Sequence, residues 1–485
     1  MPSGITEPPP LAFLESRSFH PWLVVTVASS SAFIGQLDAS IVQLALPALK
    51  ITFGASIDDV RWVAIAYLLA FAATLPLFGR MCELYGRKLL YLSGFAIFSL
   101  ASLLCGSTND LGWLIALRAV QGVGGGLLGA NSIAILVKSV PLDKRATGIA
   151  LLTATQAIGV GIGPIVGGVL LEALSWRWIF WVTVPFGLAA ALLGWLVLPR
   201  SNETANDMSL DWYGALLLMP ALVLAVLALN QISVWSPDSL SMLLCVAGAA
   251  GLFVLFARRE RVARWPLIDL TLFARVAFTT GLIRVALGYA LLYGMLFLMS
   301  FALVHGLHNS PAVAGLKLAL IPIALGVIAP LGVVFSDRFT PRRVGVVSMI
   351  LCTAAIAALS AIAFAPRGAL ITGLSAFAIF GMGLGLYLAP NSTSTIGAAP
   401  ASQSGAAGAL VNLFRTLGSC VGISAASSMM SWRMHQAAGA DFDRILFEGS
   451  PLLDAIESSL LVLAGFALMV IVTAWINARF GHEAA

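Results

Sequence analysis

Charged residues are scarce in this sequence. Only 10% of the 485 residues are Asp, Glu, Lys or Arg, whereas 59% are hydrophobic, and the mean hydropathy is +0.96. A water-soluble globular protein needs more polar surface than such a composition can provide. The composition therefore excludes a soluble protein and predicts an integral membrane protein, with the lipid bilayer as its solvent.

Motifs that carry chemistry are also missing. The five cysteines are odd in number and scattered along the chain, so they indicate neither a disulfide framework nor a metal site. His305 and His308 are closely spaced, but two imidazoles without an adjacent acid favour a solvated loop over a metal site. There is no H-E-x-x-H helix, nucleophile elbow, carboxylate pair or P-loop. We therefore expect no enzyme activity, no bound metal and no organic cofactor.

Long apolar runs, by contrast, are abundant. A run of about 20 apolar residues is long enough to cross a bilayer as a helix. Fourteen such runs have bounds near 22–46, 60–79, 88–107, 111–137, 146–171, 178–198, 212–230, 240–257, 278–304, 313–335, 344–365, 368–396, 404–430 and 456–478. They are continuous rather than alternating, and about twice as long as barrel strands. The sequence therefore predicts an all-α integral membrane bundle of fourteen transmembrane helices.

Lys and Arg are unevenly distributed over the loops between these runs. The loops on one side of the membrane carry most of them, in stretches such as 80–88, 138–145 and 257–275. Basic loops tend to stay in the cytoplasm, so we expect both termini there and a multi-pass protein of the inner (plasma) membrane. The net charge of +5 follows from this bias and requires no nucleic-acid partner.

Polar stretches divide the runs into six, two and six. The expected parts are a cytoplasmic tail (1–20), an N-terminal six-helix half (21–198), a linker with two extra transmembrane helices (199–275) and a C-terminal six-helix half with a short cytoplasmic tail (276–485). The halves contain similar loops, since GRMCELYGRKLL (79–90) and GVVFSDRFTPRR (332–343) both combine glycine, an acid and a basic pair. Two parallel repeats predict a bundle of two six-helix halves with a cavity between them.

The loop at 79–90 resembles a signature of the major facilitator superfamily, G-x-L-x-D-R-x-G-R-R. The residues that carry the resemblance are Gly79, Glu83 in place of Asp, Gly86, Arg87 and Lys88. The resemblance implies a gating loop that controls a conformational switch, with Asp337 and Arg338 in the equivalent loop of the C-terminal half. Such a loop can pair with the other half in one state and release it in another. The alternative is a basic loop that serves topology alone.

Further stretches resemble the fourteen-span drug:proton antiporters of that superfamily. They are QLDASIVQLALP (36–47), SWRWIFWVTVPFG (175–187) and GALVNLFRTLGSCVG (408–422). The fifth run, GVGIGPIVGG, resembles the helix motif that marks antiporters rather than symporters, through Gly159, Gly163, Pro164, Gly167 and Gly168. Glycines four residues apart also form a smooth ridge for helix contact, so a purely structural seam is the alternative.

Asp38 lies inside the first run, where a carboxylate is costly. Low-dielectric surroundings favour its protonated form, so we expect Asp38 to bind the coupling proton. Arg118 and Gln121, in LRAVQGVGGG (117–126), resemble a family motif, R-x-x-Q-G, whose arginine is linked to proton transfer. One alternative is a fixed ion pair of Asp38 with another helix, for instance through Arg118. Another is that Arg118 snorkels to the outer surface.

Other polar residues inside the runs are candidates for the cavity wall. Gln36 and Gln43 join Asp38 as candidates for proton coupling or substrate binding, and the further cavity candidates are Asn131, Gln156, Asn412 and Arg415. Hydrogen bonds that join helices are the alternative role for these side chains. Arg284 lies close enough to the inner end of its run to snorkel to the interface.

These features predict a proton-coupled antiporter that exports hydrophobic small molecules, cationic ones among them, by alternating access. The alternatives are an exporter of one metabolite such as a lipid, siderophore or natural product, a proton symporter for uptake, and a sensor derived from a transporter. The resemblance leaves open a periplasmic adaptor and an outer-membrane channel, which some relatives use as partners.

Overall fold

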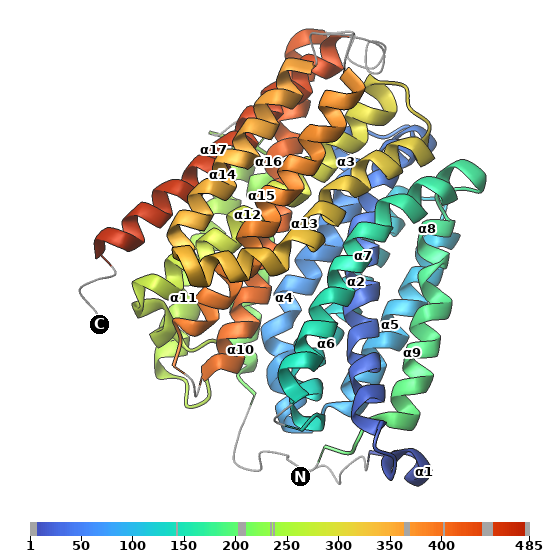
Figure 1. Cartoon of the computed structure of the whole chain (residues 1–485), viewed down its shortest axis with the longest axis vertical. Helices are drawn as coiled ribbons and strands as arrows, with labels where there is room; N and C mark the ends of the chain where they lie inside the picture. The colour runs from blue at the N-terminus through green and yellow to red at the C-terminus, as the bar shows by residue number, and fades with distance from the viewer. Residues whose placement is uncertain are drawn as a thin grey trace.

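The computed structural model describes residues 7–141, 144–201, 210–232, 235, 238–362, 369–400, 403–438 and 450–480. Regular structure in these residues is helical throughout, and the long helices form one elongated bundle (Figure 1). Fourteen of the helical segments are long and apolar enough to cross a membrane. The predicted all-α membrane bundle and its number of spans are therefore confirmed.

The spans of the N-terminal half lie within a few residues of the predicted bounds, except that α2 and α4 both continue past their predicted ends. The long helices are α2 (His20–Phe53), α4 (Trp62–Tyr85), α5 (Lys88–Ser107), α6 (Leu111–Ser139), α7 (Arg145–Ala173) and α9 (Thr183–Val197), and the short ones are α1 (Ala12–Glu15), α3 (Ile57–Val60) and α8 (Trp178–Trp181). Helix α2 continues through Pro47 and ends where Gly54 takes up a left-handed conformation, with φ 58°. Glycine adopts this conformation without steric cost, which makes it a common helix stop.

The linker and the C-terminal half follow the same pattern. The linker contains α10 (Trp212–Asn230), α11 (Leu240–Val262) and the 3₁₀ turn η2 (Leu270–Ala274). The C-terminal half contains α12 (Val276–Phe301), the π-helical turn η3 (Ala302–Gly306), α13 (Pro311–Phe339), α14 (Pro341–Ile362), α15 (Ala369–Gly397), α16 (Ser404–Ala438) and α17 (Ser450–Phe480). Helix α16 runs about two turns past its predicted end at 430, because the end of apolar character does not by itself stop a helix.

Equivalent helices pair in the two halves, and glycines make the contacts close. Helix α2 packs on α7, and α12 packs on α16 in the same way. A Cβ atom at Gly163 would lie 1.9 Å from Ser40 Oγ, and one at Gly422 would lie 2.1 Å from the Ala290 carbonyl oxygen. Because no Cβ fits at those distances, the backbones approach as closely as glycine allows.

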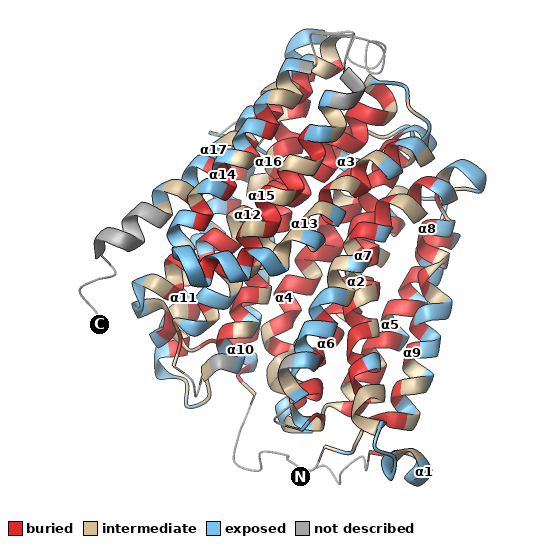
Figure 2. Cartoon of the chain, in the orientation of Figure 1, coloured by how far each residue is buried: buried red, intermediate tan, exposed pale blue. Residues whose placement is uncertain are grey.

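Three helix pairs make most of the contacts between the halves. Helix α7 packs on α13, α4 on α16 and α2 on α12, while α10 of the linker contacts both α4 and α16. In the central helix α12, 83% of the most apolar stretch is buried, whereas in α11, on the outside of the bundle, the buried share is 22% (Figure 2). Exposed apolar side chains cover the outer helices, as expected for a surface in contact with lipid tails.

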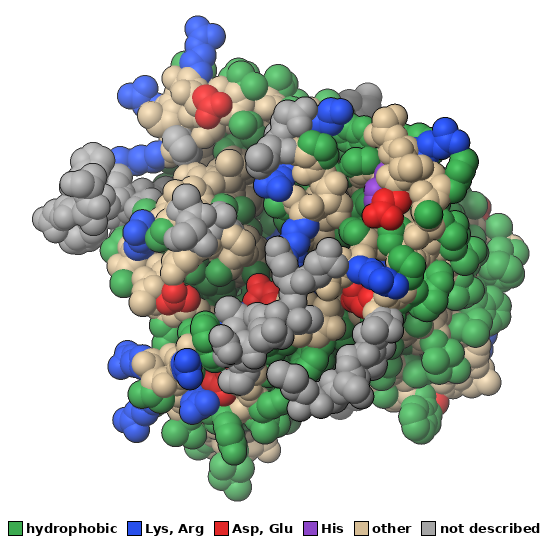
Figure 3. Space-filling view, turned by 90° about the horizontal axis from the view of Figure 1, so that it is seen from below, with side chains coloured by type: hydrophobic (Ala, Val, Ile, Leu, Met, Phe, Trp, Pro, Cys, Tyr) green, Lys and Arg blue, Asp and Glu red, His purple; other side chains and the backbone are tan. Residues whose placement is uncertain are grey.

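The bundle has two distinct ends. We call the end at which α2 begins the basic end, and the other the opposite end. The N-terminus lies at the basic end (Figure 1), and Figure 3 shows this end with Lys and Arg side chains spread over it. Three of the basic loops identified in the sequence, around Arg87, Arg259 and Arg338, return to this end because successive spans alternate in direction.

Candidate functional site

Asp38 lies near the middle of α2 and has no exposed surface. Its Oδ2 is 2.7 Å from Nη1 of Arg118 on α6, and its Oδ1 accepts a hydrogen bond of 2.9 Å from Nε2 of Gln121, one turn further along α6. Arg118 Nη1 also donates to Oε1 of Gln121, at 2.6 Å. These three side chains form a closed triangle, which we call the Asp38 cluster. The structure thus brings together three residues that the sequence singled out.

The surroundings of the Asp38 cluster fix its geometry. Arg118 Nε donates to the Val63 carbonyl oxygen at 2.9 Å, and its guanidinium lies 4.5 Å from the centre of the Tyr67 ring. Gln121 Nε2 also donates to Ser102 Oγ at 3.2 Å, and that hydroxyl lies 2.7 Å from Thr183 Oγ1. Side chains and backbone groups from five helices of the N-terminal half, α2, α4, α5, α6 and α9, therefore converge on this one buried site.

Arg118 is fully buried, so the alternative in which it snorkels to the outer surface is wrong. The ion pair with Asp38, left open by the sequence, is present. Removing two charges from water is costly unless each is paired and its remaining hydrogen-bonding groups are satisfied. Here both carboxylate oxygens accept charged or amide N–H groups, and the guanidinium has backbone, side-chain and aromatic partners.

Gln36 and Gln43 lie apart from this cluster. Gln36 Oε1 accepts a long hydrogen bond, 3.4 Å, from the Tyr293 hydroxyl of α12, which links the two halves. The Gln43 side chain is buried, and its amide has no hydrogen-bond partner among the described residues. Five residues were predicted for coupling or substrate binding. Three of them form the Asp38 cluster, and the other two, Gln36 and Gln43, lie on α2 before and after Asp38.

The further cavity candidates also occupy different places. Arg415 is half-buried on α16, and its guanidinium lies 5.6 Å from the ring centre of Tyr289 on α12. Asn412, one turn earlier, has a buried Oδ1 without a partner within the described part of the chain. Asn131 is buried and donates to Cys82 Sγ and the Leu127 carbonyl oxygen, both at 2.8 Å, so it joins helices. Gln156 is half-buried on α7.

The glycine motif of α7 contacts two helices at once. Gly159, Gly163 and Gly167 face α2, where added Cβ atoms would meet Phe33, Ser40 and Ile41. On the α13 side, a Cβ atom at Gly315 would lie 2.1 Å from the carbonyl oxygen of Pro164, and one at Gly168 would lie 2.4 Å from that of Pro311. The motif therefore lies where α2 of one half and α13 of the other approach the same helix.

The gating loop is tied to the N-terminal half, the N-terminal tail and the linker. Glu83 pairs with Arg80, 2.7 Å away on the same helix, and Gly86 takes φ 96°. Arg87 N donates to Ser201 Oγ at 2.7 Å. Lys88 Nζ donates to the carbonyl oxygens of Pro8 and Leu198, at 2.9 and 2.8 Å.

The equivalent loop of the C-terminal half makes no recorded pair with the gating loop. Asp337 and Arg338 are exposed on α13, and Arg338 lies over the neighbouring Phe339 ring at 5.6 Å. A Cβ atom added at Gly79 would have no neighbouring atom within 4 Å. Among the described residues, no hydrogen bond or ion pair therefore connects the two loops at the basic end in this conformation.

Besides the bond of Gln36 to Tyr293, polar contacts between the halves lie toward the opposite end, and the sequence analysis missed the main group of them. Arg61, at the start of the predicted run 60–79, is fully buried and pairs with Asp58 at 2.8 Å. It donates to the hydroxyls of Ser427 and Ser428 on α16, at 3.1 and 3.0 Å, and to the carbonyl oxygen of Asn230 at the end of α10. Ser431 of α16 donates to Asp58 at 2.5 Å. We call this group the Arg61 network.

Two smaller features complete the opposite end. Glu172 at the end of α7 accepts a hydrogen bond of 3.0 Å from the backbone N–H of Ala312, at the start of α13. His305, which the sequence predicts in a solvated loop, is instead buried in η3.

The serines of SAASSMMS (424–431) were the available signal for the Arg61 network, because polar side chains recurring on one helix inside a span require partners.

Comparison with known proteins agrees with this geometry. The family model described as Major Facilitator Superfamily matches residues 28–423. The chain belongs to this superfamily. It is 30% identical over 411 residues to the riboflavin transporter RibZ of Clostridioides difficile, covering 84% of this chain and 88% of that one. It is 29% identical over 435 residues to the tetracenomycin C resistance and export protein of Streptomyces glaucescens, covering 89% and 79%.

The fold of this superfamily member is also found in solved structures. A bacterial homolog of the human lysosomal transporter Spinster, in an inward-facing and unoccupied conformation, superposes with a TM-score of 0.71 at 15% identity, covering 96% of this chain and 98% of that one. The likeness concerns the fold alone. The family and these relatives indicate a multi-pass membrane transporter rather than an enzyme.

Proposed function

We propose that this transporter is a proton-coupled antiporter, which exports hydrophobic small molecules, cationic ones among them, across the plasma (inner) membrane. The observation that carries the proposal is the position of Asp38, a carboxylate without exposed surface at the middle of a membrane-spanning helix. Ionisable residues in such places are rare, and their default role is in ion or proton pathways. The drug-export relative supports the direction and the class of substrate.

In the proposed cycle, the observed conformation is the deprotonated one. The ion pair with Arg118 and the amide of Gln121 hold the Asp38 carboxylate in its charged form. We propose that Asp38 takes up its proton in the outward-facing state and releases it to the cytoplasm in the inward-facing state. The ion pair with Arg118 then forms again, and Asp38 is sealed from water as observed here. Protonation would remove the charge that holds the cluster together and so free α2 from α6.

Helix α2 would transmit that change to the rest of the transporter. It packs on the glycine ridge of α7, and α7 packs in turn on α13 of the other half. Gln36, less than one turn from Asp38, contacts Tyr293 of α12. Proton and substrate then bind to opposite conformations, so each lowers the affinity for the other. The electrical part of the driving force is about 2.3 kcal/mol per charge per 100 mV.

The arrangement of the halves supports alternating access. We propose that residues 21–198 and 276–485 rock about the contact of α7 with α13, while 199–275 link them and both termini lie in the cytoplasm. The Arg61 network closes the opposite end, and the loops at the basic end are not paired across the halves among the described residues. With the basic end in the cytoplasm, this state faces inward. A periplasmic adaptor with an outer-membrane channel is an optional partner in the proposal.

A second candidate is a transporter of one anionic or aromatic metabolite. The riboflavin transporter among the relatives favours it. So does Arg415, whose guanidinium has the Tyr289 ring as its only recorded partner in the described residues. A cation beside an aromatic ring suits a planar or anionic ligand better than a cationic one. Uptake by symport has less support, because the α7 motif resembles that of antiporters.

The test is transport in proteoliposomes. The purified protein is reconstituted with a fluorescent hydrophobic cation, and a pH gradient is imposed. We expect gradient-driven movement of the dye by the wild type and its loss in Asp38→Asn, which cannot change charge. Asp454→Asn, at an exposed acid near the start of α17, is the matched control and should transport normally. Equal transport by wild type and Asp38→Asn would remove Asp38 from the mechanism.

A further inference from the structure

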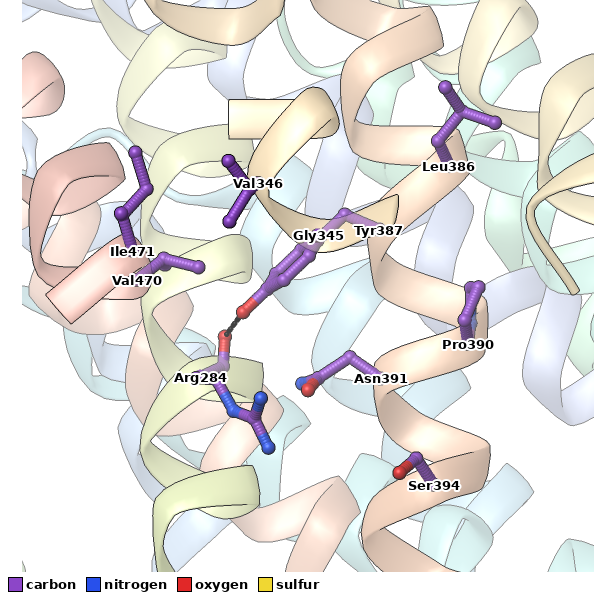
Figure 4. A pocket seen from close by; sticks show the side chains of 10 residues that line it. All are labelled: Arg284, Gly345, Val346, Leu386, Tyr387, Pro390, Asn391, Ser394, Val470 and Ile471. Atoms are coloured by element: carbon purple, nitrogen blue, oxygen red, sulfur yellow. Dashed lines mark hydrogen bonds between the residues drawn. The ribbon is translucent and has the colours of Figure 1, made fainter. Parts of the chain in front are cut away.

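A second polar site lies inside the C-terminal half, away from the Asp38 cluster. A pocket between α12, α14, α15 and α17 is lined by Arg284, Gly345, Val346, Leu386, Tyr387, Pro390, Asn391, Ser394, Val470 and Ile471 (Figure 4). Arg284 lies eight residues into α12, which is about 12 Å along a helix. Ser394 lies one turn before the end of α15. The pocket is therefore one to two turns inside the basic end of the bundle.

Arg284 is 9% exposed, so the bundle covers most of its side chain. Its recorded side-chain hydrogen bond is a weak one, 3.3 Å from Nε to the Thr280 carbonyl oxygen. No carboxylate pairs with it among the described residues. A guanidinium cannot escape the cost of burial by losing its proton, and an unpaired buried charge is strongly destabilising. The N–H groups on its two terminal nitrogens have no recorded acceptor within the described residues and are available to a ligand.

Other hydrogen-bonding groups face the same space. In Figure 4 the amide of Asn391 and the hydroxyl of Ser394 lie on the side of the pocket that holds the guanidinium. Asn391 makes only a long bond, 3.4 Å, to the Gly281 carbonyl oxygen, and Ser394 Oγ has no recorded partner in the described residues. Tyr387 holds the α12 backbone in place by donating to the Arg284 carbonyl oxygen at 3.0 Å. The pocket thus offers a cation and two neutral donors to one ligand.

We propose that this pocket binds an oxyanion, the phosphate group of an anionic lipid, with the Arg284 guanidinium as its principal ligand. The planar fork of N–H groups on arginine matches the oxygens of a phosphate. The proposal concerns a site separate from the transport pathway and does not depend on the direction of transport.

The apolar part of the pocket lining favours a lipid over a dissolved ion. Val346, Val470 and Ile471 give the pocket an apolar side on α14 and α17, two outer helices with lipid-facing surface. Arg342 and Arg343 are exposed two to four residues before Gly345 and Val346, at the start of α14. Basic residues at this depth attract anionic headgroups. An acyl chain can follow the apolar side while the phosphate reaches Arg284.

The experiment measures Arg284-dependent binding to the full chain. Purified, delipidated protein in a neutral detergent is titrated with dioleoyl phosphatidylglycerol, with uncharged dioleoylglycerol, or with inorganic phosphate, and the thermal-unfolding midpoint is followed. We expect phosphatidylglycerol to raise the midpoint of the wild type, and uncharged dioleoylglycerol not to. In Arg284→Gln the apparent affinity should fall by about tenfold or more, since a charge-assisted contact is lost. Arg433→Gln, at an arginine near the opposite end of α16, is the matched control and should bind as the wild type does.

A second variant covers the case in which Arg284→Gln does not fold. Val346→Trp leaves the guanidinium intact and fills part of the pocket with a larger side chain. It should reduce the rise in unfolding midpoint caused by phosphatidylglycerol to a similar degree. A rise in midpoint with inorganic phosphate that depends on Arg284 would support the oxyanion site and make a free anion its ligand. Equal stabilisation of the wild type, Arg284→Gln and Val346→Trp by phosphatidylglycerol would overturn the proposal.

Discussion

Arg61 and Ser428 are joined by a hydrogen bond of 3.0 Å, although 367 residues separate them in the chain. Arg61 precedes α4 in the N-terminal half, and Ser428 lies on α16 in the C-terminal half. The same guanidinium reaches the end of α10 in the linker through the Asn230 carbonyl oxygen. One buried side chain thus connects three parts of the protein at the opposite end, and α10 contributes directly to that closure.

Breaking the Arg61 network should open the opposite end. In Arg61→Gln the charge-assisted contacts to Asp58, Ser427 and Ser428 are lost, each worth about 1.5 kcal/mol or more. The closed conformation should therefore lose at least tenfold in population relative to the open one. The measurement is the rate at which a membrane-impermeant maleimide labels a cysteine introduced at Ser424, which is fully buried here.

The control for this measurement is another arginine of the same end. Arg177 bonds to the Thr108 carbonyl oxygen and to Asn109, all within the N-terminal half. Arg177→Gln should therefore leave labelling at position 424 unchanged. The five native cysteines are buried, so they contribute little background. If Arg61→Gln labels no faster than the wild type, the network is not what holds the halves together.

The Asp38 cluster should respond asymmetrically to loss of either charge. Asp38→Asn leaves the Arg118 guanidinium buried without a counter-charge, a change that typically costs about 3–5 kcal/mol. Arg118→Gln should cost less, because a lone carboxylate can take up a proton and become neutral, whereas a guanidinium cannot lose one. The double variant should recover part of the loss. The measurement is unfolding in micelles, with the free energy of interaction taken from the double-mutant cycle. Additive losses would mean that the 2.7 Å pair contributes nothing to stability.

The glycine ridge of α7 offers a test with its control on the same helix. Gly163→Ala places a Cβ 1.9 Å from Ser40 Oγ, so α2 and α7 must separate, and we expect a loss of about 1–3 kcal/mol in stability. Transport should fall as well, because α7 carries the contact between the halves. At Gly161 the nearest atom would be 3.5 Å away, an ordinary contact, so Gly161→Ala should be neutral or slightly stabilising. Equal behaviour of the two variants in thermal unfolding and dye transport would contradict a close-packed role for the ridge.

The sequence predicted the spans and singled out Asp38, for physical reasons that are local. An apolar run must be helical in lipid, and a carboxylate inside it stands out in the sequence itself. Arg118 and Gln121 were recognisable because a family motif contains them. That they bond to Asp38, rather than reach the surface, depends on how α6 is rotated against α2, and composition does not determine this rotation.

The surroundings of Arg61 and Arg284 could not be predicted from the sequence, because they come from distant segments of the chain. Arg61 lies between α3 and α4, and it bonds to α16 and to the end of α10. Arg284 lies in the first turns of α12, and residues of α14, α15 and α17 line the pocket beside it. In both cases the sequence near the residue gives the correct depth in the membrane and cannot give the neighbours.

Arg415 distinguishes the two candidate functions. Its half-buried guanidinium beside Tyr289 repels a cationic substrate and attracts an anionic one. If the transporter exports hydrophobic cations, Arg415→Gln should leave dye transport intact or improve it. If it carries an anionic or flavin-like metabolite, the same change should raise KM for that substrate by about tenfold, the usual effect of losing one charge-assisted contact. The measurement is the initial rate of uptake into everted vesicles, with a cationic dye and with riboflavin as substrates. Arg433→Gln serves as the control, because it removes a charge from α16 away from Arg415 and Tyr289. Equal loss with both substrates would mean that Arg415 serves the packing of α16 against α12 and has no part in substrate selection.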